Sequence, residues 1–184
     1  QAFSSPGGTA GSATSVIGVV DSRVWDNASV LSVGMTNGEL FSVTAEAVLN
    51  GSNYFAYGAD GRWEIIGVKT CALVSANTYN LSTILRGRFG TEWAMSTHLS
   101  GDKVVLLSDT DVTAIGVSIS VIGLMRTYRG VTLDQDVSTA TDTFFTYAGV
   151  NLKPLSAAYC TLYRDVTSDD IVGSWVRRTR YGGE

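Results

Sequence analysis

LRGRFGTE, residues 85–92, places three charged side chains and two glycines between apolar runs that are typical of strands. Gly87 and Gly90 flank Arg88 and Phe89 and predict a sharply bent backbone, with Phe89 anchoring the turn in apolar surroundings. Arg86, Arg88 and Glu92 form either an exposed contact patch or an internal clamp, in which guanidinium groups bind neighbouring carbonyl and carboxylate groups. The clamp is our preferred interpretation.

Around this stretch, short apolar runs alternate with turn residues, which predicts an antiparallel β-structure. Asn37-Gly38 is a candidate two-residue hairpin turn because both residues tolerate positive φ. The predicted strands are 16–20, 30–35, 40–43, 54–57, 63–68, 71–74, 79–85, 103–107, 114–124, 143–147, 160–163 and 171–177. Short helices are expected at 44–49, capped by Thr44 or Ser42, and at 92–95, capped by Thr91. The predicted fold class is all-β, mainly antiparallel, with one or two short helices, and the strands allow a barrel or a sandwich.

The pattern divides the chain into three parts. Residues 1–15 are rich in Gly and Ser and are predicted to be a flexible linker. Residues 16–108 form a β-rich domain that carries the motif, and residues 109–184 form a second β-rich segment that could belong to the same unit. The start at Gln1 and the end directly after a strand-like segment predict a piece of a longer protein.

Composition narrows the classes of function. The formal net charge of −4 argues against general nucleic-acid binding, which needs a basic surface. Arg accounts for 10 of the 13 basic residues, which favours protein partners because guanidinium groups suit planar interface contacts. Cys71 and Cys160 are far apart, no CxxC occurs and His98 is the single histidine, so no metal site is expected and both thiols are predicted to be buried.

Candidate catalytic groups were sought among the acidic residues. Asp134 and Asp136 would share one face of a strand and could bind a divalent cation or act as paired glycosidase carboxylates. They are interpreted instead as solvated loop residues, like Asp109 with Asp111 and Asp169 with Asp170. His98 could pair with Ser96 or Ser100, but no nucleophile elbow is identifiable, and His98 is interpreted as structural. We therefore expect no enzyme activity, no catalytic residue and no cofactor.

A second basic and aromatic stretch, Trp175–Arg180, ends a predicted strand. It contains Trp175, Arg177, Arg178 and Arg180. Because the whole chain is acidic, a structural or subunit contact is favoured over nucleic-acid binding.

These motifs also carry a family resemblance. The order 64–67, 72–74, 79–81 and then 85–92 resembles the tail-tip hub proteins of long-tailed phages and gene transfer agents, often called host specificity proteins. Residues 46–53 upstream, and His98, Gly101-Asp102 and 104–107 downstream, follow the same order. Residues 152–156 and 175–180 match the later pattern. The resemblance covers roughly Asp26 to Gly183 and is weakest between Asp109 and Val150.

The resemblance implies a structural component of a phage tail tip, or baseplate hub, which closes the tail tube and links it to host-recognition parts. It implies a homotrimer that contacts other tail-tip and tail-tube proteins, in a virion made in the bacterial host cytoplasm. The residues expected to form a structural or interface motif are Arg86, Gly87, Arg88, Gly90, Thr91, Glu92, Trp175, Arg177, Arg178 and Arg180. The alternative is a tail-tip module that binds a host surface glycan or receptor through exposed Tyr and Trp. A glycan-cleaving enzyme using Asp134 and Asp136 is ranked last.

Overall fold

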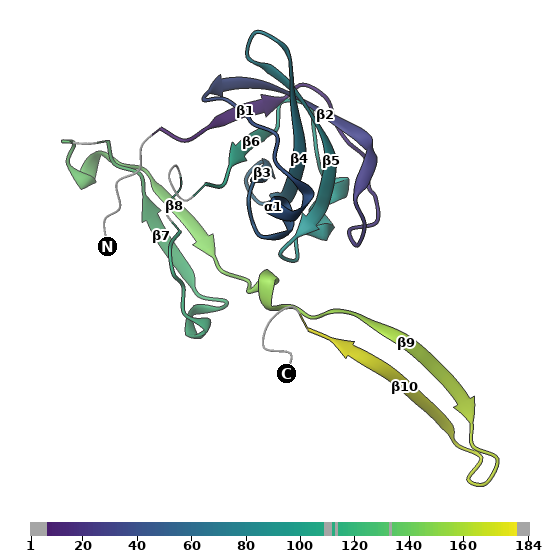
Figure 1. The fold of residues 1–184 in the computed structure, drawn as a ribbon. Coiled ribbons are helices and arrows are strands. Elements are labelled where there is room, and N and C mark those ends of the chain that lie inside the picture. Colours follow the sequence, from purple (N-terminus) through teal and green to yellow (C-terminus); the bar gives the residue numbers. More distant parts are fainter. Residues whose placement is uncertain (1–6, 109–111, 113, 133, 180–184) are drawn as a thin grey trace. The chain divides into compact units, whose positions relative to one another are not determined.

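The computed structural model describes residues 7–108, 112, 114–132 and 134–179 (Figure 1). The chain divides into two compact units, of which the first ends at Ala114 and the second starts at Ile115. The boundary expected near Asp109 falls at the edge of a stretch, 109–111, that lies outside the described residues.

The first unit is a closed antiparallel barrel with the strand order β1-β2-β5-β4-β3-β6. This confirms the all-β class and decides between the two architectures in favour of the barrel. Its strands are β1 (Ala10–Ala13), β2 (Asp26–Asn37), β3 (Tyr54–Gly58), β4 (Glu64–Ser75), β5 (Thr78–Arg88) and β6 (Lys103–Leu106). The helix α1 (Ala45–Leu49) and the 3₁₀ helix η1 (Glu92–Ser96) lie in the connections.

Inward-facing side chains fill the barrel, as expected for a barrel with few strands. Leu31, Val33, Phe55, Ile66 and Leu81 have no exposed surface. They come from β2, β3, β4 and β5, so that the four longer strands each contribute to one core. A small second cluster, made of Val48, Tyr54 and Leu85, packs α1 against the outside of the sheet.

The expected linker is wrong for residues 10–13. These form β1, which pairs with β2 on one side and with β6 on the other and thereby closes the barrel. The small residues permit this close pairing, because a Cβ on Gly11 would lie 2.5 Å from the carbonyl oxygen of Gly34. The 1–6 part of the expected linker lies outside the described residues.

The hairpin expected at Asn37-Gly38 is also wrong. Gly38 does adopt a positive φ of 78°, but residues 39–44 form no strand, and β2 pairs with β1 and β5 instead. The Asn37 side-chain amide donates to the carbonyls of Gly7 and Gly8, so the N-terminal segment occupies the place beside β2. Residues 16–20 likewise form no strand, although Ile17 is buried in the core.

Both predicted short helices form, but only one of them has the predicted side-chain cap. At α1, the Thr44 side chain accepts a hydrogen bond from the Ala47 N–H, as predicted. At η1, Thr91 makes no such cap. Its hydroxyl accepts from the Ile65 N–H at 2.9 Å and donates to the Arg88 carbonyl at 2.7 Å, which ties the motif to β4.

The second unit consists of two antiparallel hairpins. β7 (Met125–Arg129) pairs with β8 (Asp142–Thr146), and β9 (Leu155–Arg164) pairs with β10 (Ile171–Arg178). Three short 3₁₀ helices, η2 (Ile119–Val121), η3 (Val137–Thr139) and η4 (Val150–Leu152), lie in its connections. The strand expected at 114–124 is wrong, because 115–118 has no regular structure and 119–121 is η2.

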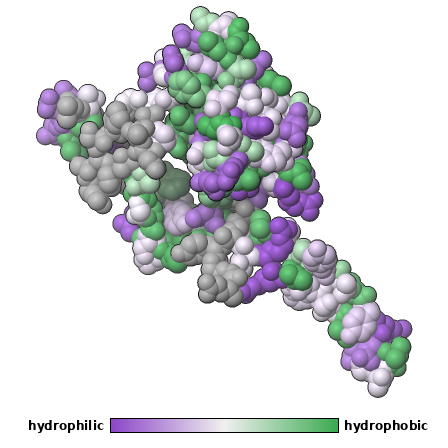
Figure 2. Space-filling model, viewed as in Figure 1, coloured by the Kyte–Doolittle hydropathy of each residue, from purple (hydrophilic) through white to green (hydrophobic). Residues whose placement is uncertain are grey.

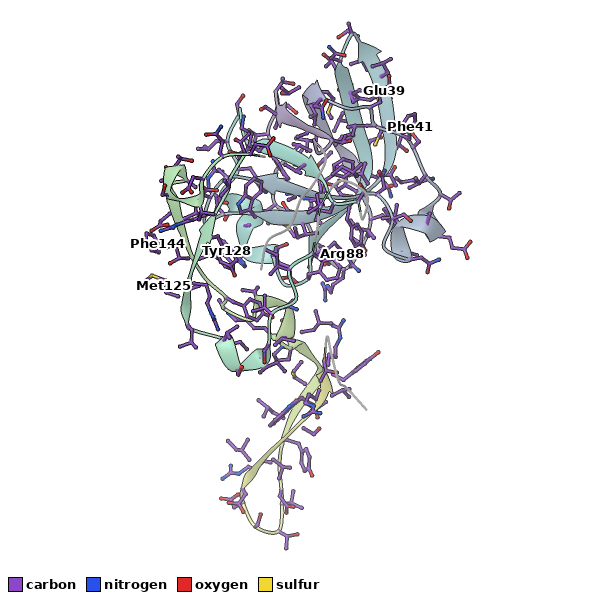
Figure 3. All side chains as sticks on the ribbon, turned by 90° about the vertical axis from the view of Figure 1, so that its left-hand side faces the viewer. Glu39, Phe41, Arg88, Met125, Tyr128 and Phe144 are labelled. Atoms are coloured by element: carbon purple, nitrogen blue, oxygen red, sulfur yellow. The ribbon has the colours of Figure 1, made fainter. Side chains whose placement is uncertain are left out.

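Almost nothing is buried in this unit. Among its described residues, Gly149 alone falls in the buried class. In Figure 3, the labelled Met125, Tyr128 and Phe144 side chains belong to the β7–β8 hairpin, and Phe144 is 58% exposed. Two-stranded sheets are at best marginally stable alone in water. The second unit therefore lacks the core that would hold it together without further contacts.

Candidate functional site

A buried ionic network at one end of the barrel is the most constrained polar feature of the described chain. Glu64 begins β4, Arg86 lies near the end of β5, and both side chains are fully buried. The Arg86 Nε and Nη2 atoms donate to the two carboxylate oxygens of Glu64, each at 2.8 Å. This bidentate pairing is the strongest geometry available to an arginine and a carboxylate.

The motif backbone joins the same carboxylate. The Gly87 N–H donates to Glu64 Oε1 at 2.7 Å, and the remaining Arg86 nitrogen, Nη1, donates to the Gly18 carbonyl at 2.9 Å. Arg86 thus binds a carboxylate and a carbonyl from segments far apart in sequence. These are the contacts that an internal clamp requires.

His98 extends the network toward the loop before β6. Its Nε2 lies 2.6 Å from Glu64 Oε2, and its Nδ1 lies 3.4 Å from Asp102 Oδ2. The imidazole stacks on the Tyr57 ring with a centroid distance of 3.8 Å and an angle of 15°. The sequence-based interpretation of His98 as structural agrees with this buried position.

Asp102 is in turn held by Arg62, whose guanidinium forms a bidentate ion pair with it and donates from Nη1 to the Thr97 carbonyl at 2.7 Å. The Leu99 N–H adds a further hydrogen bond to Asp102 Oδ2 at 2.9 Å. Two carboxylates and two guanidinium groups therefore balance in charge around the His98 ring. Arg62 and Asp102 are the part of the network nearest to solvent.

The pKa shifts follow from this arrangement. Burial would raise the pKa of Glu64, but hydrogen bonds from His98 and Arg86, with the charge of Arg86, lower it below its ordinary value. For Asp102, burial is likewise outweighed by Arg62, so its pKa is lowered. Burial raises the pKa of Tyr57 to about 12. The carboxylates of Glu64 and Asp102 are thus ionised at neutral pH.

This network is suited to holding the barrel end together. The Glu64, Arg86 and His98 side chains have no exposed surface, so a substrate does not reach them in this structure. Within the described part of the chain, no three His, Cys, Asp or Glu side chains are arranged to hold a metal.

The other motif residues surround the clamp. Gly87 and Gly90 have φ of 60° and 90°, and Phe89 also has a positive φ, 54°. A Cβ on Gly87 would lie 2.6 Å from Met95 Cε and 2.8 Å from Glu92 Cα, so Gly is required there. Glu92 begins η1.

Phe89 and Arg88 differ from expectation. Phe89 is 54% exposed and meets Tyr54 edge to face at 5.5 Å, so it is not the buried anchor that was predicted. Arg88, labelled in Figure 3, is half-buried, and its Nε is buried without a hydrogen-bond partner. Arg86 alone of the two motif arginines forms a clamp.

The remaining candidate residues lie in the second unit. Trp175, Arg177 and Arg178 belong to β10, where Trp175 is 65% exposed, and Arg180 lies outside the described residues. Asp136 caps η3 by accepting from the Ser138 N–H, and Asp134 has a positive φ of 66° in the preceding turn. Their capping and turn positions are typical of loop acidic residues.

The two cysteines divide between the units. Cys71 is buried in the barrel, where burial raises its pKa to about 11. Cys160 is exposed on β9, which corrects the expectation that both thiols are buried.

Sequence reasoning missed Glu64, Arg62 and Asp102 as members of a site. Glu64 stood in an apolar run between Trp63 and Ile65, and a lone acidic residue in such a run is a signal of a buried ion pair. The partners of Glu64 could not be identified from the sequence, because they lie at strand ends and in loops up to 34 residues away.

Comparison with known families gives a match. Residues 8–105 match the family described as Rcc01698-like, C-terminal, which covers the whole barrel from just before β1 nearly to the end of β6. Comparison with curated proteins gives no match. The helices of the described residues are all too short to cross a bilayer. Since the match spans more than half of the chain, this protein belongs to the Rcc01698-like, C-terminal family.

Proposed function

We propose that this chain is a structural module of a phage tail tip, acting in the baseplate hub that closes the tail tube and links it to host-recognition parts. The observation that carries the proposal is the contrast between a closed, internally clamped barrel and a second unit whose apolar side chains lack a core. A module built for assembly needs a rigid body and surfaces that become buried only in the assembly.

The exposed apolar side chains of the second unit support the proposed role in assembly, because they are large as well as numerous. Tyr159, Leu162, Ile171 and Trp175 on one hairpin are between 65% and 84% exposed. Figure 2 shows apolar and polar residues interspersed along this hairpin. Such side chains are the type that forms the core of protein interfaces.

The proposed partners are further copies of the chain, arranged as a homotrimer, and other tail-tip and tail-tube proteins. The proposed location is the virion tail tip. The proposal includes no catalytic step, and the buried network has the role of fixing the barrel end that the Arg86-Gly87 turn closes.

Labelling tests the proposal. An antibody raised against the chain is applied to tailed particles from the source organism, and the particles are viewed by negative-stain electron microscopy. We expect label at the distal end of the tail. Absence of label on both intact and disrupted particles would overturn the tail-tip assignment.

A receptor-binding or glycan-binding role at the same tail tip is the second candidate. It is favoured by the 84% exposure of Tyr159 and the 65% exposure of Trp175, since exposed aromatic rings can stack on sugars. The isolated chain would then decorate host envelope preparations, and free glycan would remove it. A hub module predicts neither result.

A further inference from the structure

The outer edge of β10 (Ile171–Arg178) is the longest unpaired strand edge in the described chain that no positive-φ residue interrupts. β9 and β10 form a two-stranded sheet, so each has one edge without a strand partner in that sheet. The β9 edge is interrupted, because Tyr159 has a positive φ and β9 places two residues, Tyr159 and Cys160, opposite the single residue Trp175 of β10. Bulges of this kind protect an edge from pairing.

β10 has no such protection. None of Ile171–Arg178 has a positive φ, and no proline interrupts the strand. Its residues alternate regularly, with Ile171, Gly173 and Trp175 on one face. Leu162 and Arg164 of β9 lie on the same face, opposite Gly173 and Ile171.

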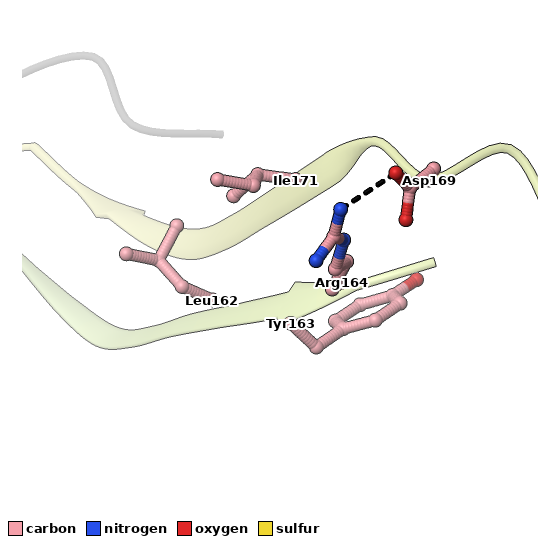
Figure 4. A pocket seen from close by; sticks show the side chains of 5 residues that line it. All are labelled: Leu162, Tyr163, Arg164, Asp169 and Ile171. Carbon is pink, nitrogen blue, oxygen red and sulfur yellow. Dashed lines mark hydrogen bonds and ion pairs between the residues drawn. The ribbon is translucent and has the colours of Figure 1, made fainter. Parts of the chain in front are cut away.

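This face is apolar and open. Leu162 is 78% exposed and Ile171 is 77% exposed. Together with Tyr163 and the Arg164–Asp169 ion pair they line a shallow pocket (Figure 4). A neighbouring strand on the β10 edge would extend this face and cover part of it.

The charges at the two ends of β10 identify the strand that fits. Asp169 and Asp170 come directly before the strand, and Arg177 and Arg178 end it. Parallel pairing of two copies would bring like charges together at both ends. Antiparallel pairing brings the acidic end of each copy to the basic end of the other.

We propose that β10 is a self-pairing edge, which joins two copies of this chain in an antiparallel four-stranded sheet with the order β9-β10-β10-β9. The charges also set the register. With Ser174 opposite Ser174 of the second copy, Arg178 faces Asp170 of that copy, and Arg177 lies diagonally from its Asp169. The Trp175 rings of the two copies then flank the two-fold axis on the same face.

This contact is two-fold, so it is distinct in symmetry from the three-fold contacts of the proposed trimer. It would join copies of the free chain or copies from two rings. It stands on the hairpin alone and does not depend on the tail-tip assignment.

Disulfide trapping tests the register. The full chain carries Cys160→Ser to remove the exposed thiol, and Ser174→Cys to place a thiol on the proposed axis, where opposing Cα atoms are close enough for a disulfide. Under mild oxidation we expect a covalent dimer on a non-reducing gel. Ile171→Cys in the same background is the control, because its two copies lie roughly 20 Å apart in the proposed register, from the rise per residue of a strand.

Charge reversal tests the orientation. Adding Arg178→Asp should lower the yield of the Ser174→Cys dimer roughly tenfold, because both opposite-charge pairs become like-charge pairs. The further change Asp170→Arg in the same chain should restore it. Equal trapping at positions 171 and 174, or a dimer that ignores both charge changes, would overturn the proposal.

Hydrogen exchange on the unmodified chain gives a second measurement that no substitution can disturb. The β10 amides should become protected as the protein concentration rises, while the β9 outer edge should not. Equal exchange of β10 at all concentrations would overturn self-pairing, whereas a failure of tail labelling would leave this result untouched.

Discussion

The two units use the same kind of ion pair in opposite environments. In the barrel, Glu64 and Arg86 have no exposed surface, whereas in the β9–β10 hairpin Arg164 is 67% and Asp169 is 75% exposed. A buried pair constrains the chain because losing one partner leaves an uncompensated charge, while an exposed pair contributes little. The comparison teaches that the barrel is stabilised from within, and that the hairpins have no comparable internal source of stability.

Removing the buried cation should produce the largest difference between the units. Arg86→Met leaves Glu64 buried without its charge partner and should lower the free energy of unfolding by about 3–5 kcal/mol. Urea denaturation followed by circular dichroism measures the change. Arg164→Met, in the exposed pair of the hairpin, is the matched control and should leave the transition nearly unchanged. Equal effects of the two substitutions would show that the buried and the exposed ion pair do not differ in their contribution to stability.

A methyl group added at Gly87 should have the second-largest effect on stability. Gly87→Ala adds a Cβ within 3 Å of Met95 and Glu92 at a positive φ, and should cost about 1–3 kcal/mol from strain and overpacking. Gly61→Ala is the control, because Gly61 also has a positive φ but its Cβ would meet nothing within 4 Å. Comparing the thermal unfolding curves of the two variants separates the effect of steric crowding from the effect of backbone strain. A Gly87→Ala variant as stable as Gly61→Ala would show that the turn is not tightly packed.

Acid should weaken the barrel through its carboxylates. The pKa values of Glu64 and Asp102 are lowered in the folded state from ordinary values of 4.5 and 3.8. The unfolded chain therefore binds more protons below about pH 4.5, and the free energy of unfolding should fall as the pH falls through this range. Glu64→Gln should flatten part of this dependence. A Glu64→Gln variant with the same pH dependence as the unmodified chain would contradict the ionised network.

Truncating an exposed hairpin side chain should have the smallest effect on the barrel. Trp175 is 65% exposed, so Trp175→Ala should leave the main unfolding transition of the chain within experimental error. The measurement is the urea midpoint by circular dichroism. A clear loss of stability would show that Trp175 is packed against other residues and contributes to a core.

Sequence patterns located most of the barrel strands because their apolar runs are paired on both sides. β3 and the cap at Thr44 were predicted close to their observed bounds. The single strand β4 was predicted as two strands, 63–68 and 71–74, and the strand predicted at 79–85 continues to Arg88 in β5. β1 was missed because Ala10–Ala13 holds small residues with no apolar run, and it is a strand only through its partners β2 and β6.

The opposite error occurred at 114–124. Ile115, Val117 and Ile119 alternate as in a strand, yet each is at least 40% exposed and has no strand beside it. A period of two indicates which side chains avoid water. A strand also needs an adjacent strand that forms hydrogen bonds with its backbone N–H and C=O groups. For the same reason the motif showed that Arg86 has a role, but not that Glu64, His98 and Asp102 complete it.

Hydrogen exchange of the isolated full chain at low concentration tests the central claim most directly. The account predicts slow exchange for β4 and β5 amides, protected by the barrel and its buried network, and exchange near the unprotected rate for β7 to β10. Equal protection of the hairpins and the barrel at low concentration would contradict the account, because it would show that the second unit has a stable core of its own.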